Sequence, residues 1–134
     1  MSYKKGARRE HELIEELEKR EYACTRSAGS GKGGKKADGE EREQPDVLAG
    51  NGDNFYAFES KSSTRDNHIY IDEDEIEDLK YFSTNFGAKP RIGARFDYND
   101  FAFFKPSELH QTESGNYRVK LEDVEDAETI KDLA

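Results

Sequence analysis

The sequence is poor in cysteine, in tryptophan and in long apolar runs. Among its 134 residues, Cys24 is the only cysteine, and there is no tryptophan. A lone cysteine excludes an intrachain disulfide, so we expect an intracellular, cytoplasmic protein rather than one from an oxidising compartment. No apolar run approaches the roughly 18 residues that a membrane helix needs, and no secretory leader is visible. We therefore expect no membrane partner.

Apolar residues of all kinds are scarce. They make up 33% of the chain, whereas charged residues make up 38%, against roughly 25% in an average soluble domain. The length suits one compact domain with a modest core. The eight phenylalanines and seven tyrosines cluster in strand-like runs. We therefore expect a small core under a heavily charged surface.

The net charge of −9 is unevenly distributed. Residues 1–36 contain ten Lys or Arg and six Glu, which gives +4, whereas residues 121–134 contain six acidic residues and one lysine, which gives −5. A basic N-terminal part on an acidic body can present a local phosphate-binding face. The acidic surface also suggests a halophilic source, because a high-salt cytoplasm screens repulsion between carboxylates.

Two segments have the periodicity of amphipathic helices. Residues 5–20 place apolar side chains at spacings of three and four, and Glu10 shares their face. A second helix is expected from about residue 72 to residue 86. Its acidic start suits the helix dipole, and Gly87 is a natural stop.

Short extended runs lie between and after these helices. Strands are expected at residues 22–27, 46–50, 55–62, 68–71, 91–97 and 101–105, with one more edge strand within residues 106–120. The element order α-β-β-β-α-β-β predicts a mixed α/β domain. We expect this domain to span residues 1–121, with a flexible glycine-rich insert at about residues 31–44. Residues 122–134 are expected to form a solvated acidic tail.

One strand pair carries charges where apolar residues are expected. Within QPDVLAGNGDNFYAFESKSS (44–63), a hairpin brings Asp46 beside the second strand, and alternation puts Glu59 and Lys61 on one face of that strand. Glu10 is expected on the inward face of the preceding helix. Buried carboxylates are normally paired or bound to metal, and a divalent cation would relieve the repulsion among three of them. Oxygen ligands favour a hard ion such as Mg²⁺.

This set of residues suits phosphodiester hydrolysis. Mg²⁺ can polarise a phosphodiester and lower the pKa of a bound water. A neighbouring lysine can orient that water, help to deprotonate it or stabilise developing negative charge, and the sequence leaves open which of these Lys61 does. Pro45 and Asp46, followed after twelve residues by Glu59-Ser60-Lys61, resemble the PD-(D/E)XK nuclease signature.

The resemblance narrows to one family, the archaeal Holliday-junction resolvases of the Hjc type, over roughly residues 4–120. The matching segments are the basic, glycine-containing start with its helix (KKGARREHELIEELEKR, 4–20), RSAGS (26–30), PDVLAGNG (45–52), IYI (69–71), FSTNFG (82–87) and KPRIGARF (89–96). The resemblance implies a restriction-endonuclease-like fold, in which helices flank a mixed central sheet.

The resemblance also implies roles for particular residues. The implied metal ligands are the carboxylates of Glu10, Asp46 and Glu59 and the backbone carbonyl of Ser60, with Mg²⁺ as the cofactor and Mn²⁺ as a substitute. Lys61 would be the active-site lysine that stabilises the transition state. Ser30 would be the catalytic-site serine that handles the phosphate at the point of cleavage.

Contacts with DNA and with a second subunit are implied in the same way. The implied DNA-binding residues are Lys4, Lys5, Arg8, Arg9, Arg26, Ser30 and Lys32. Phe82 and Phe86 match aromatic positions of the family's dimer interface. A homodimer suits a four-way junction, because two active sites related by a two-fold axis match two symmetric scissile phosphates.

The function that the resemblance implies is structure-selective cleavage of four-way DNA junctions by paired symmetric nicks, in homologous recombination and repair. Recognition would depend on branched shape and phosphate positions. A sliding clamp or recombination proteins are candidate partners, and a nucleoid-associated location would follow. Two alternatives stay open: a PD-(D/E)XK endonuclease for another DNA structure, and a non-catalytic junction-binding module.

Plainer interpretations exist for single residues. Glu59 and Lys61 could be an ordinary charge pair on a wet strand face, and Ser30 could be an ordinary loop residue. Phe82 and Phe86 have the spacing of core residues, so burial within the monomer would also explain them. The combination of motifs, rather than any one of them, favours the nuclease interpretation.

Overall fold

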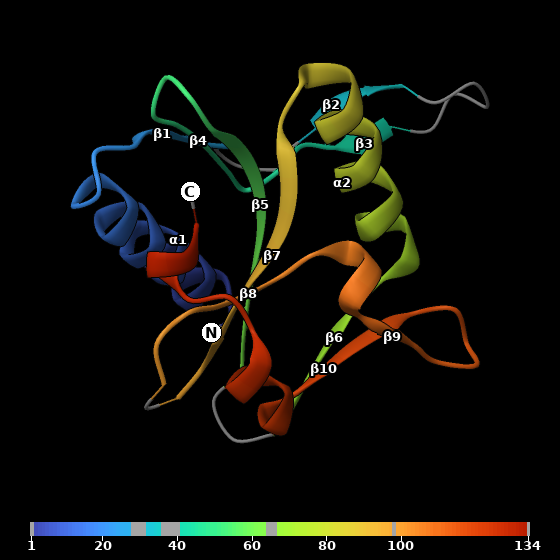
Figure 1. Ribbon diagram of the computed structural model, residues 1–134. Helices are drawn as coiled ribbons and strands as arrows, with labels where there is room; N and C mark the ends of the chain where they lie inside the picture. The colour runs from blue at the N-terminus through green and yellow to red at the C-terminus, as the bar shows by residue number, and fades with distance from the viewer. Residues whose placement is uncertain (1, 28–31, 36–40, 64–66, 98, 134) are drawn as a thin grey trace.

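A mixed sheet of five strands separates two helices in the computed structural model (Figure 1). The model describes residues 2–27, 32–35, 41–63, 67–97 and 99–133, with residues 2–6 and 32–35 described by their backbone alone. The strand order is β1-β4-β5-β7-β8. The strands are β1 (Ala23–Arg26), β4 (Val47–Gly50), β5 (Phe55–Ser63), β7 (Lys89–Phe96) and β8 (Ala102–Phe104).

The two helices cover opposite faces of this sheet (Figure 1). Helix α1 (Ser2–Glu18) begins three residues earlier than the sequence predicts and packs through Leu13 and Leu17, which are fully buried. Helix α2 (Glu73–Phe86) ends at Gly87, whose φ of 91° is the left-handed conformation that glycine adopts without strain. Within the described residues, no helix is long and apolar enough to cross a membrane.

The pairing of β5 fixes which side chains face which helix. Strand β5 pairs with β4 as an antiparallel hairpin and with β7 in parallel. The parallel connection runs through β6 (His68–Ile71) and α2. Alternation along β5 places Ala57 in the cluster that includes α2 residues and places Tyr56 and Phe58 in the cluster that includes α1 residues. The predicted alternation is therefore confirmed.

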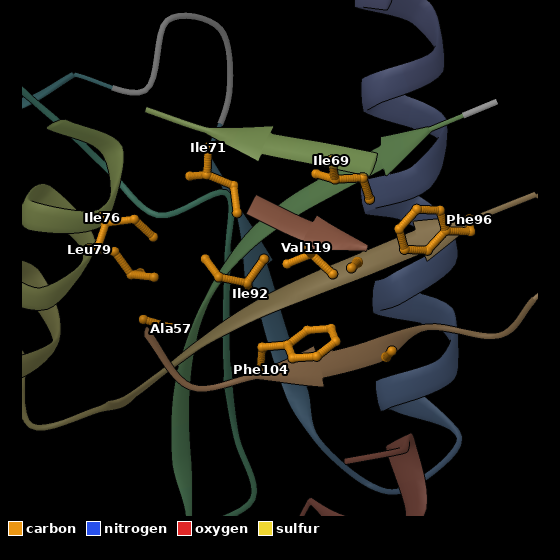
Figure 2. Packing of buried hydrophobic residues seen from close by; sticks show 11 residues of the cluster. Ala57, Ile69, Ile71, Ile76, Leu79, Ile92, Phe96, Phe104 and Val119 are labelled. Atoms are coloured by element: carbon orange, nitrogen blue, oxygen red, sulfur yellow. The ribbon is translucent and has the colours of Figure 1, made fainter. Parts of the chain in front are cut away.

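The larger core cluster lies between the sheet, α2 and a second, three-stranded sheet. That sheet has the order β6-β10-β9, with β10 at Tyr117–Lys120 and β9 at His110–Gln111. Figure 2 shows Ile76 and Leu79 of α2 pointing towards Ile92 of the central sheet, with Val119 beside it. Burial of such side chains stabilises the fold by about 1.5–3 kcal/mol each. This packing holds the first turns of α2 against the sheet.

The glycine-rich insert differs in part from the predicted flexible loop. Its described residues form an antiparallel pair of strands, β2 (Lys32–Lys35) and β3 (Glu41–Glu43). The pair docks on α2, because the Glu43 amide donates a 3.0 Å hydrogen bond to Asp78 Oδ2 and the Arg42 guanidinium lies 3.7 Å from the centre of the Tyr81 ring. Contacts with a distant helix, rather than local propensity, order this segment.

The C-terminal residues also differ from the predicted solvated tail. Two 3₁₀ helices form here, η2 (Leu121–Asp126) and η3 (Ile130–Asp132), and Glu128 between them pairs with Phe103 of β8. The amide of Phe103 donates to the Glu128 carbonyl at 2.8 Å, and Arg91 Nε lies 2.7 Å from Glu128 Oε1. Leu133 is buried in the α1 cluster. The segment therefore covers the β8 edge of the sheet, which would otherwise expose unpaired backbone groups.

Candidate active site

Charged side chains gather where the β4–β5 hairpin meets both helices. Asp46 immediately precedes β4, Glu59 and Lys61 lie on β5, Glu10 lies on α1, and Glu75 lies in the first turn of α2. The sequence predicts four of these five. The structure brings the four into one connected group of charges, with Asp46 between Glu10 on one side and the β5 pair on the other.

Asp46 is held rigidly by three hydrogen bonds. Its backbone amide donates to the Phe58 carbonyl at 2.9 Å, its carbonyl accepts from the Ser27 amide at 2.9 Å, and its Oδ2 accepts from the Ser60 amide at 2.8 Å. Burial raises the pKa of Asp46, and the Ser60 amide and Lys61 oppose that shift. Asp46 is therefore a fixed carboxylate whose ionisation is less favourable in this site than in water.

Glu59 is the most enclosed carboxylate of the group. It is only 7% exposed. Burial, and next the negative charge of Asp46, raise its pKa well above the ordinary value. A carboxylate whose pKa a neighbouring carboxylate raises in this way lies in surroundings that do not fully neutralise negative charge.

Lys61 lies between two carboxylates. Its Nζ is 2.7 Å from Glu75 Oε2 and 3.7 Å from Glu59 Oε2. Burial alone would lower the pKa of Lys61, but the charges of Glu59 and Glu75 outweigh burial and raise it. The side chain is therefore a stable ammonium with a hydrogen bond to Glu75.

Glu10 joins the group from α1. Burial, and next the charge of Asp46, raise its pKa from 4.5 to about 7, and Arg26 opposes the shift. Arg26 Nε lies 3.4 Å from Glu10 Oε1. Glu10 thus shares its electrostatic environment with the carboxylate of Asp46.

The donor set fits a hard divalent cation in its chemistry. The three carboxylates with raised pKa supply oxygen ligands and negative charge, which are what Mg²⁺ and Mn²⁺ prefer. As the described side chains lie, no three His, Cys, Asp or Glu groups are already placed to hold one ion. The ion pairs of Arg26 with Glu10 and of Lys61 with Glu59 offset part of the negative charge instead.

The predicted DNA-binding residues fall into four groups. Arg8 is exposed on α1, and Arg26 is partly exposed beside Glu10. Arg9 is buried, with its guanidinium 2.9 Å from Glu12 and 3.2 Å from Asp97, so the fold itself uses its charge. The backbone alone is described for Lys4 and Lys5 in α1 and for Lys32 in β2. Ser30 lies outside the described residues.

The two predicted dimer-interface residues lie at the end of α2. Phe82 packs against the core while partly exposed, whereas Phe86 is 61% exposed. Their rings stack with centroids 4.9 Å apart. Core spacing therefore explains Phe82 but leaves Phe86 with a large apolar surface facing outwards.

Glu75 is the site residue that sequence reasoning missed. Within the acidic run at residues 72–75, its charge is explained equally well by the helix dipole. One signal distinguishes it: Glu75 precedes Leu79 by four positions and Phe82 by seven, so it shares the inward face of α2. Its neighbours Glu73 and Asp74 do not share this spacing, and they are exposed.

The fold and the site together define a class. A mixed five-stranded sheet flanked by helices, with an aspartate before one strand and Glu-x-Lys in the next, is the restriction-endonuclease-like fold with a PD-(D/E)XK motif. The chain belongs to the archaeal Holliday junction resolvase (Hjc) family, whose model matches residues 1–134. The resemblance seen in the sequence is therefore confirmed.

Individual relatives agree with this assignment. The crossover junction endodeoxyribonuclease Hjc of Archaeoglobus fulgidus is 33% identical over 115 residues, which cover 86% of this chain and 78% of the relative. The protein of the same name from Methanocaldococcus jannaschii is 36% identical over 117 residues, covering 87% and 77%. The solved structure of A. fulgidus Hjc, described as a Holliday junction resolvase, superposes with a TM-score of 0.78 at 29% identity, covering 94% of this chain and 92% of that one.

Proposed function

We propose that this protein is an endonuclease that resolves four-way DNA junctions through paired symmetric nicks. The observation that carries the proposal is the group formed by Asp46, Glu59 and Lys61 at the β4–β5 hairpin, in a chain that belongs to the Hjc family. Relatives in that family are named crossover junction endodeoxyribonucleases. Homologous recombination and repair are the processes that such an activity serves.

In the proposed reaction the carboxylates of Glu10, Asp46 and Glu59, with the backbone carbonyl of Ser60, would hold Mg²⁺ or Mn²⁺. A bound ion would polarise the scissile phosphate and lower the pKa of a water. The raised pKa of Lys61 argues against the role of general base, because an ammonium donates hydrogen bonds and cannot accept a proton. Of the two remaining roles, we propose that Lys61 would stabilise the negative charge that develops on the phosphate oxygens.

The proposal extends to the assembly and to the DNA contacts. We propose a homodimer that uses the exposed Phe86 and its stacked partner Phe82, because an outward apolar pair is a natural contact between copies. Arg8 and Arg26 would contact phosphates near the active site, with Lys4, Lys5, Lys32 and Ser30 as further candidates. The site of action would be the nucleoid in the cytoplasm, with recombination proteins or a sliding clamp as further proposed partners.

Cleavage of a synthetic four-way junction beside a linear duplex of the same sequence tests the proposal. We expect cleavage of the junction in Mg²⁺ or Mn²⁺, none in EDTA, and paired nicks at symmetric positions. Asp46→Asn should abolish cleavage while junction binding persists. Equal cleavage of duplex and junction would favour a nuclease for another DNA structure. Binding without cleavage by the wild-type protein would favour a non-catalytic module.

A further inference from the structure

Glu75 connects the active-site lysine to the start of a helix. One carboxylate oxygen, Oε2, lies 2.7 Å from Lys61 Nζ. The other, Oε1, accepts a 3.1 Å hydrogen bond from the backbone amide of Asp72, the residue before α2. The Glu75 side chain is 16% exposed. Both oxygens are thus engaged by fixed partners from different elements.

The geometry gives Glu75 a larger part than Glu59 in orienting Lys61. A lysine side chain is a flexible four-carbon stem, so its ammonium needs a partner to hold it in one place. The distance of 3.7 Å to Glu59 is an ion-pair distance, whereas 2.7 Å to Glu75 is a charge-assisted hydrogen bond. Glu75 is itself held by the Asp72 amide, so it can in turn restrict the position of the Lys61 ammonium.

The arrangement also leaves Lys61 with donors to spare. An ammonium has three N–H groups, and the Glu75 hydrogen bond uses one. The other two remain available for phosphate oxygens.

We propose that Glu75 is a positioning residue that holds the Lys61 ammonium in its working orientation from the first turn of α2. This inference rests on the proposed function, in which Lys61 contacts the scissile phosphate. Glu75 acts through Lys61 and is assigned no contact with DNA. The helix start and the active site are therefore coupled through a single carboxylate.

Two variants separate positioning of Lys61 from capping of α2. Glu75→Ala removes both hydrogen bonds and also the side-chain interaction of Glu75 with Glu59. Asp72→Pro removes the backbone donor to Glu75 together with the Asp72 carboxylate of the same capping box, but it leaves the hydrogen bond between Glu75 and Lys61. The φ of −64° at Asp72 is one that proline adopts. Glu77→Ala is the matched charge control, because Glu77 is exposed on the same helix and pairs with Lys80.

The first readout is single-turnover cleavage of a four-way junction by the full-length protein, with the dissociation constant measured in parallel. Glu75→Ala is expected to lower the cleavage rate at least tenfold with an unchanged dissociation constant. Glu77→Ala is expected to leave the rate unchanged. Asp72→Pro loses one anchor of Glu75 but keeps the 2.7 Å contact with Lys61, so it is expected to lower the rate by no more than about threefold, even where it lowers the melting temperature. Cleavage by Glu75→Ala at the rate of Asp72→Pro would overturn the proposal.

The second readout does not depend on cleavage. The NMR signal of the Lys61 ammonium, assigned by its loss in Lys61→Met, should exchange slowly with water in wild type and in Asp72→Pro, and rapidly in Glu75→Ala. The proposal would be overturned if the Lys61 ammonium of wild type exchanged with water as fast as that of the exposed Lys80. It would also be overturned if Glu75→Ala left the exchange rate of Lys61 unchanged. If wild type bound junctions without cutting them, the proposed function would be wrong. The exchange rates of the Lys61 ammonium in wild type and in Glu75→Ala would still decide whether Glu75 holds Lys61 in place.

Discussion

Replacement of Glu10 by glutamine should stabilise the metal-free protein. Burial and Asp46 raise the pKa of Glu10 from 4.5 to about 7, so its ionised form is less favourable in the folded state than in the unfolded chain. The folded protein therefore binds more protons between these two values, and stability falls as the pH rises through that window. Unscreened, the shift corresponds to about 3 kcal/mol. Because Glu10 is partly exposed, we expect about 1–2 kcal/mol after solvent screening.

Thermal unfolding in EDTA at pH 8 and at pH 4 measures this effect. At pH 8, Glu10→Gln should raise the melting temperature by about 2–8 °C. At pH 4 the gain should vanish, because Glu10 is protonated in the folded state and largely so in the unfolded chain. Mg²⁺ should raise the melting temperature of wild type more than that of the variant, because a bound ion relieves the same repulsion.

The matched control is Glu15→Gln, which removes a charge from an exposed position of the same helix. It should change the melting temperature little at either pH. The reasoning would be refuted if Glu10→Gln were no more stable than Glu15→Gln in EDTA at pH 8. That result would mean that the charge of Glu10 is not crowded by Asp46, and the proposed metal site would lose its electrostatic basis.

Four further predictions follow from the same structure. Lys61→Met should lower single-turnover junction cleavage about 10²–10³-fold without weakening junction binding, and a loss below tenfold would contradict the charge-stabilising role. Glu128→Ala should lower the free energy of unfolding in urea by about 1–2 kcal/mol, because it removes the carboxylate that pairs with the buried Arg91; the exposed Glu125→Ala is the control and should change it little. Phe86→Glu should convert a dimer into a monomer in sedimentation experiments, and an unchanged mass would exclude this face as the interface. The melting temperature should rise from low to molar KCl, because salt screens the acidic surface, and a flat response would count against a halophilic source.

The part of the active site that depends on local geometry could be predicted from the sequence. Alternation along one strand was enough to place Glu59 and Lys61 together, because side chains two apart on a strand share a face. The hairpin turn was enough to bring Asp46 beside them. These placements depend on short-range geometry, which a sequence pattern records directly.

The contacts that the sequence did not reveal depend on how separate elements pack on one another. The pairing of Glu75 with Lys61 depends on how α2 rotates on the sheet, which the packing of Ile76 and Leu79 decides. The local pattern was equally consistent with an acidic helix start stabilised by the helix dipole.

Dependence on tertiary contacts also explains why the structures of the insert and of the C-terminal segment differ from the predictions. The β2–β3 pair is glycine-rich and charged, and its docking depends on the contact of Glu43 with Asp78. The C-terminal segment is acidic throughout, yet the partner of Glu128 is Arg91, which lies 37 positions away. Composition predicted a flexible insert and a solvated tail, whereas specific tertiary partners decided the outcome for the described residues.

Crystals grown with Mn²⁺ and measured at the manganese absorption edge test the proposed metal site most directly. The predicted result is an anomalous peak enclosed by the carboxylates of Asp46 and Glu59 and the carbonyl of Ser60, with Glu10 at its edge, and its loss in Asp46→Asn. A protein that cleaves junctions in Mn²⁺ but binds the ion away from these residues would contradict it.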